Sequence, residues 1–198
     1  MYELPKTVKT ESGATYHIRK SGDFRMILDC FKALQDTKIS EDARILASLI
    51  IFYEEFTTIW DIPADQGEVK SLIEQMYKFF NCGKRESVGA QTSTALINWE
   101  NDSQLICAAV NAVAKMEIRA LEYLHWWTFI GYYISVGESV LATVVGIRDK
   151  VIKGKKLEKW ERDFKRANPE HFIWRQADIE SQDIDRMLRN RFHRSGGQ

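Results

Sequence analysis

The stretch Glu122–Tyr133, EYLHWWTFIGYY, places eight apolar or aromatic side chains in twelve positions. On a helix, five of these side chains fall within one broad stripe: Tyr123, Trp126, Trp127, Ile130 and Tyr133. One neighbouring helix cannot cover so much apolar circumference. The stretch therefore predicts either a central helix surrounded by others, or a helix that leaves part of its surface to a partner protein.

The longer apolar run around this stretch extends from Ile118 to Val136 and approaches the length of a membrane span. Arg119, Glu122 and His125 interrupt it. A charged side chain at the centre of a span costs about 2.5–3.5 kcal/mol on insertion scales. We therefore expect a buried helix of a soluble protein and no membrane segment.

Composition favours a mainly α fold. The 198 residues are 44% hydrophobic and 28% charged, which is typical of a globular chain with one core and appendages. Eleven glycines and three prolines are few, which favours long helices joined by short turns. The three cysteines are widely spaced and predict neither disulfides nor a zinc site. The N-terminal residues lack the apolar segment of a signal peptide, so we expect a cytoplasmic protein.

Local patterns predict a multi-helix bundle with a short N-terminal β-hairpin. Lys6–Thr10 and Thr15–Ile18 resemble two strands around a turn, and such a ribbon must lie on helices or pair with another chain. Helical periodicity begins at Asp23, again after Ser40, and again after Asp65-x-x-Glu68. The predicted parts are the hairpin appendage 1–22, the N-terminal helical part 23–82, the linker 83–94, the C-terminal helical part 95–175 and the basic tail helix 176–198.

Further helices are expected in the second half. Asn101-x-x-Gln104 predicts the start of one helix, and Gly137 ends the aromatic one. Between Lys153 and Arg166, basic residues alternate with Trp160 and Phe164, as they do on some nucleic-acid-binding surfaces. Acidic residues occur in the same stretch, and Leu157, Trp160 and Phe164 are spaced as one helical face. We therefore predict that these three side chains pack in the core.

Charge is unevenly distributed although the net charge is zero. Residues 36–74 contain nine acidic and three basic residues, whereas 148–175 contain ten basic and five acidic ones. Four more arginines follow: Arg186, Arg189, Arg191 and Arg194. This asymmetry is compatible with head-to-tail self-association, with an acidic partner or nucleic acid on the C-terminal part, or with a solvated helical surface, which we favour.

No familiar catalytic arrangement is present in the sequence. The four histidines lie in separate predicted elements, and none has the spacing of a metal-binding pair. The stretch from Gly146 to Lys156 lacks the spacing of a phosphate-binding loop, and no GxSxG motif occurs. His125, among tryptophans, is expected to be a packed residue. We therefore predict no enzyme activity and no catalytic, cofactor-binding or metal-binding residues.

Five segments together resemble a family of siphophage proteins. They are LPKTVKTESGATYHIR (4–19), SGDFR (21–25), INWENDSQLICAAV (97–110), LEYLHWWTFIGYY (121–133) and VVGIRDK (144–150). In this order they are similar to the gene-product-fifteen family of tailed phages of Gram-positive bacteria, which is encoded between the tail-tube and tape-measure genes. The likeness covers Leu4 to Phe172 and is closest at Gly22–Arg25 and Leu121–Phe129. The segments 83–94 and 176–198 are longer here than the family pattern implies.

The resemblance implies a non-catalytic tail assembly chaperone in the host cytoplasm. Such a protein binds the long helical tape-measure protein, presents it to polymerising tail-tube protein and leaves before the virion is complete. Modest affinity and a displaceable apolar surface suit this task. The residues expected to contact the partner are Trp126, Trp127, Ile130 and Tyr133. The alternatives are a structural component of the tail or virion and, less favoured, a nucleic-acid-binding regulator that uses Arg186 to Arg194.

Overall fold

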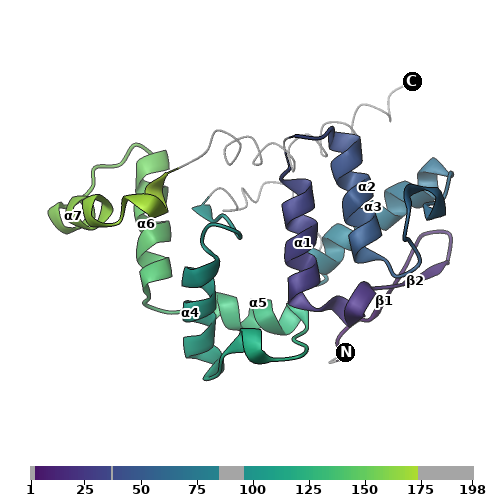
Figure 1. Cartoon of the computed structure of the whole chain (residues 1–198), viewed down its shortest axis with the longest axis horizontal. Coiled ribbons are helices and arrows are strands. Elements are labelled where there is room, and N and C mark those ends of the chain that lie inside the picture. The colour runs from purple at the N-terminus through teal and green to yellow at the C-terminus, as the bar shows by residue number, and fades with distance from the viewer. Residues whose placement is uncertain (1–2, 37, 85–95, 174–198) are drawn as a thin grey trace.

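The computed structural model describes residues 3–36, 38–84 and 96–173 (Figure 1). The described part is mainly helical and begins with a two-stranded antiparallel hairpin, which confirms the predicted fold class. Most of the predicted linker 83–94 and the predicted tail helix 176–198 lie outside the described residues. No helix in the described ranges has the length and hydropathy that crossing a membrane requires.

The hairpin lies on the helices, as expected for so short a ribbon. Strand β1, Thr7–Lys9, pairs with β2, Thr15–His17, with Val8 opposite Tyr16. Just beyond β1, the Thr10 hydroxyl donates to Glu68 Oε1 at 2.8 Å, and the Glu11 N–H donates to Ser71 Oγ at 3.0 Å. These bonds fix the ribbon to the third helix.

The first three helices begin where an oxygen-bearing side chain can accept their free N–H groups. They are α1 (Phe24–Leu34), α2 (Glu41–Phe52) and α3 (Gln66–Phe80), and their respective caps are Asp23, Ser40 and Asp65. Ser40 and Asp65 were predicted as caps from the sequence, and Asp23 as the residue at which its helix begins. Glu68 does not close a capping box on Asp65, because its carboxylate accepts the Thr10 hydroxyl instead.

Four more helices follow: α4 (Ser103–Ala114), α5 (Trp126–Ile134), α6 (Val140–Ile152) and α7 (Lys159–Ala167). Short 3-10 turns precede, separate and follow the helices: η1 (Arg19–Gly22) lies before α1, η2 (Ile59–Asp61) between α2 and α3, η4 (Ile118–Ala120) between α4 and α5, and η5 (Pro169–Phe172) after α7. The predicted cap at Asn101 is wrong. Asp102 precedes α4 and makes no side-chain cap, because its carboxylate pairs with Arg148 of α6 at 2.6 Å.

Two further expectations about helices are corrected. The aromatic helix starts at Trp126, four residues later than predicted, so Tyr123 lies outside its stripe. In α7 the buried side chain is Glu161, whose carboxylate accepts from Lys150 at 2.6 Å, while Trp160 is 54% exposed. The prediction that Trp160 packs in the core is therefore wrong.

One hydrophobic core connects the two predicted helical parts. Its buried members include Phe24 of α1, Phe52 of α2, Val110 of α4 and Trp126 of α5. No residue of α7 or η5 belongs to it. Along the longest axis of the molecule, α7 lies at one end and the hairpin, beside the connection from α2 to α3, lies at the other (Figure 1).

Candidate interaction site

The two segments with the closest family likeness, Gly22–Arg25 and Leu121–Phe129, contact each other directly. The Phe24 N–H donates to the Leu124 carbonyl at 2.9 Å, and the Leu124 N–H donates to Asp23 Oδ2 at 3.0 Å. An isolated antiparallel bridge pairs Asp23 with His125. Leu124 and His125 therefore pair with the start of α1, which explains why α5 begins only at Trp126.

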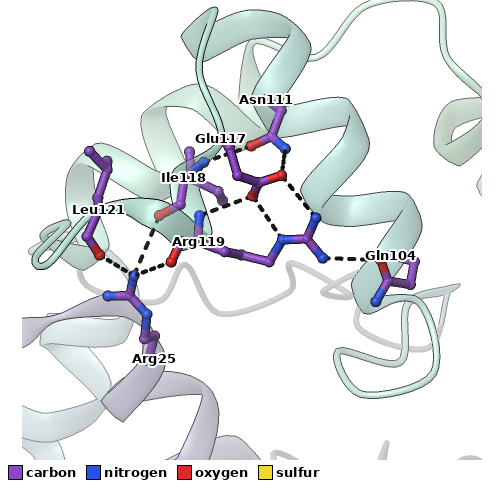
Figure 2. A network of polar contacts seen from close by, with 7 residues as sticks. All are labelled: Arg25, Gln104, Asn111, Glu117, Ile118, Arg119 and Leu121. Atoms are coloured by element: carbon purple, nitrogen blue, oxygen red, sulfur yellow. Dashed lines mark hydrogen bonds and ion pairs between the residues drawn. The ribbon is translucent and has the colours of Figure 1, made fainter.

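Asp23 and Arg25 hold this junction together by several charge-assisted hydrogen bonds. Asp23 caps α1 and forms an ion pair with Arg25 at 2.9 Å. The Arg25 guanidinium also donates to the carbonyl of Leu121 at 2.5 Å and, at 3.4 Å, to those of Ile118 and Arg119 (Figure 2). These charge-assisted bonds join α1 to η4, whose Ile118 carbonyl also accepts the Leu121 N–H within the turn.

A second polar network fixes η4 to the end of α4. Asn111 accepts the Ile118 N–H and donates to Glu117, each at 2.9 Å (Figure 2). Glu117 also accepts two side-chain bonds from Arg119, which in turn reaches Gln104. Bonding to Arg119 lowers the pKa of Glu117 to about 2, so this carboxylate remains charged at neutral pH. The network positions the extended segment that meets α1.

Gly22 occupies a position in this junction that no other residue fits. Its φ is +77°, and an added Cβ would lie 2.6 Å from Phe79 Cζ and 3.2 Å from His125 Nε2. L-residues rarely adopt this backbone region. The absence of a side chain therefore lets η1 approach both α3 and His125.

His125 is a structural residue in this arrangement. Its ring is 1% exposed, Nδ1 accepts the Trp127 N–H at 3.0 Å, and Nε2 lies 3.2 Å from the Pro5 carbonyl. These contacts fit the neutral ring with its proton on Nε2. Burial lowers the pKa of the imidazole, although the Pro5 carbonyl opposes the shift. The sequence predicted a packed histidine, and the structure adds its role as the cap of α5.

The residues proposed to bind a partner differ in exposure. Trp126 is 1% exposed, donates its indole N–H to the Phe80 carbonyl and packs against Phe129. Trp127 donates to the Phe79 carbonyl and is partly buried. Ile130 and Tyr133 are also partly buried against the core. Trp126 is a core residue, the other three are partly buried, and contact of all four with a partner stays a prediction.

The most exposed apolar side chains here are Ile134, at 74%, and Val140, at 53%. They lie at the end of α5 and the start of α6, a region that we call the α5–α6 corner. Sequence reasoning missed both residues. The signal was present, because Ile134 follows Trp127 and Ile130 at seven and four positions and so continues the same helical face.

Among residues 3–36, 38–84 and 96–173, no group of three or more His, Cys, Asp or Glu side chains is arranged to hold a metal ion. The described cysteines Cys30, Cys82 and Cys107 are free thiols. Burial raises the pKa of the Cys82 and Cys107 thiols.

The chain was compared with protein families, curated proteins and solved structures. The family described as Bacteriophage Gp15 protein matches residues 3–171, which covers all the elements of the junction. No curated protein and no solved structure shows a significant match. The matched range includes both Gly22–Arg25 and Leu121–Phe129. These two segments are separate motifs in the sequence and contact each other in the fold. The chain belongs to the bacteriophage Gp15 protein family.

Proposed function

We propose that this phage protein is a non-catalytic tail assembly chaperone that binds the tape-measure protein through the α5–α6 corner. It acts in the host cytoplasm and delivers its partner to tail-tube protein. The observation that carries the proposal is the exposure of Ile134 and Val140 beside a helix made almost entirely of apolar residues. The identity of the partner rests on the family resemblance.

The exposed area at the α5–α6 corner suits a temporary partner. Trp127, Ile130 and Tyr133 are partly buried against the core, whereas Ile134 and Val140 are exposed. An amphipathic helix laid on such a surface buries side chains at positions i, i+3, i+4 and i+7. A small apolar contact gives modest affinity per site, which lets tail-tube subunits displace the chaperone.

Co-expression with the tape-measure protein of the same phage tests the proposal. The double variant Ile134→Asp/Val140→Asp places two charges on the corner and leaves the buried core unchanged. We expect the wild-type chain to keep the tape-measure protein soluble and to co-purify with it, and the double variant to lose both properties. Circular dichroism and thermal melting verify that the variant is folded.

Met116→Asp is the matched control, because Met116 is 48% exposed but lies beyond the end of α4, outside the corner. This variant should behave like wild type. If the tape-measure protein precipitates equally with and without the wild-type chain, the chaperone proposal is wrong. If the double variant retains binding, the corner is the wrong surface.

The alternative is a structural component of the tail or virion. The two roles differ in persistence, because a chaperone leaves the assembling particle. Mass spectrometry of purified virions distinguishes them: stoichiometric peptides from this chain favour the structural role, and their absence favours the chaperone.

A further inference from the structure

The turn η2 presents an exposed tryptophan on a firmly held backbone. Trp60 is 86% exposed. One oxygen of the neighbouring Asp61 accepts the N–H and hydroxyl of both Thr57 and Thr58, at 2.7–3.2 Å. These bonds hold the turn within the chain itself, and they lower the pKa of Asp61 to about 2, so the carboxylate is charged at neutral pH. A preformed aromatic anchor loses little conformational entropy on binding.

The segment that carries Trp60 is acidic. Residues 54–68 contain five acidic side chains and no lysine or arginine. Glu54, Asp61 and Asp65 of this segment are exposed, as is the neighbouring Ile59. A partner for this acidic end must therefore combine basic groups with apolar or aromatic area.

The opposite end of the molecule has that combination. Trp160 is 54% exposed, and Ile152 and Ile173 are exposed near it in sequence. Three exposed lysines lie just before α7 or at its first residue: Lys155, Lys156 and Lys159. Buried contacts fasten this basic end to α6: Lys150 binds Glu161, and Arg148 donates to the His171 carbonyl at 2.9 Å.

We propose that copies of this chain associate head to tail, with the acidic end around Trp60 of one copy bound to the basic end around Trp160 of the next. The charges are complementary, and each end carries an exposed tryptophan, the residue type most enriched at binding hot spots. The two surfaces differ and lie at opposite ends of the long axis (Figure 1). Such a heterologous contact extends into a chain of copies and does not stop at a two-fold dimer.

This inference is independent of the α5–α6 corner, which lies on neither end. A chain of copies would place successive corners along a line, the arrangement that an extended helical partner needs. The association itself requires no partner, so it can be tested with the purified full-length protein. Its failure would leave the proposed binding of the tape-measure protein untouched.

Two complementary variants test the contact by sedimentation velocity. Glu54→Lys/Trp60→Ala disables the acidic end, and Lys155→Glu/Lys156→Glu disables the basic end. We expect the mass of the wild-type protein to grow with concentration beyond that of a dimer, and each variant alone to associate at least about tenfold more weakly. Because each variant keeps one intact end, an equimolar mixture should form a heterodimer and nothing larger.

Lys32→Glu/Lys78→Glu is the matched control, since it reverses two exposed lysines that belong to neither end. It should associate like wild type. Raising the ionic strength from about 0.05 M to about 0.5 M should weaken the wild-type association, because salt screens exposed charges.

Three results would overturn the proposal. The wild-type protein could remain monomeric at every concentration, the end variants could associate as strongly as wild type, or their mixture could fail to form a heterodimer. A monomeric wild type that binds duplex DNA, with binding lost in Lys155→Glu/Lys156→Glu, would instead identify the basic end as a nucleic-acid surface.

Discussion

Gly22 lies where the segments Gly22–Arg25 and Leu121–Phe129 meet, and its lack of a side chain permits their contact. Gly22→Ala should destabilise the fold by about 3 kcal/mol, because a positive φ and a close contact with Phe79 add together. Urea denaturation measures the change. Gly13→Ala is the control, since Gly13 has φ +91° but only one distant neighbour at 4.0 Å, and should cost about 1 kcal/mol. Equal losses in the two variants would show that the contact with Phe79 contributes nothing.

His125 predicts a pH dependence. Its folded pKa lies below the ordinary value of 6.5, because burial disfavours the cation. The unfolded chain therefore binds a proton first as pH falls, and the folded state loses stability below about pH 6.5, by at most about 1.4 kcal/mol per pH unit. Above that pH the imidazole is neutral in both states and contributes no slope.

His125→Asn isolates this term, since asparagine can cap a helix and does not titrate. We expect the variant to lose less stability than wild type between about pH 8 and about pH 5 in urea titrations. All other titrating groups are common to both proteins and cancel in the comparison. Parallel pH profiles would show that His125 is protonated equally in the folded and unfolded states.

At the scale of the element, the sequence predicted helices well where a local rule governs them. Asp23, Ser40 and Asp65 are caps because an oxygen one residue ahead of an apolar repeat satisfies free N–H groups. These local rules failed where a residue distant in the sequence bonds to the same side chain or backbone group. The Asp102 carboxylate pairs with Arg148, which lies 46 residues later. Leu124 bonds to Asp23 at the start of α1.

In the candidate site, too, local sequence patterns predicted some features and missed those that depend on distant residues. The aromatic stretch was predicted to be either a central helix or a helix that leaves part of its surface to a partner, and Trp126 and Phe129 are core residues. Periodicity could not reveal which ring is covered, because exposure depends on neighbours contributed by other helices. Trp160 has the spacing of a core residue, yet Glu161 takes the buried place because Lys150 lies within reach of its carboxylate.

The pair Arg148 and Asp102 predicts how strongly α6 is fixed to α4. Both side chains are buried, and the guanidinium also donates to the Leu96 carbonyl at 2.8 Å. Arg148→Met leaves Asp102 buried without its cation and should cost about 3–5 kcal/mol in urea denaturation. Lys32→Met removes the exposed partner of Glu100 and should cost less than about 1 kcal/mol. Similar losses in the two variants would contradict the structural importance of the buried pair.

At the scale of the whole molecule, the Gly22–Arg25 junction makes one core out of two helical parts. Phe24 of α1 stacks on Phe129 of α5 with ring centroids 4.8 Å apart, and Phe31 meets Trp99 and Trp126. These contacts join residues that are 105, 68 and 95 positions apart in the chain, respectively. Because neither part covers its own aromatic face, the two parts should unfold together.

Native-state hydrogen exchange measures this coupling. The amides of Leu49 in α2 and Val110 in α4 are both deep in the shared core, so they should exchange with the same free energy of opening to within about 1 kcal/mol. Arg25→Gln removes guanidinium bonds across the junction and should lower both values equally. The amide of Phe164 in α7 should exchange more easily, because α7 lies outside the core cluster. If Val110 opened at a clearly lower free energy than Leu49, the two helical parts would be separate folding units, and the junction would be a contact between finished domains.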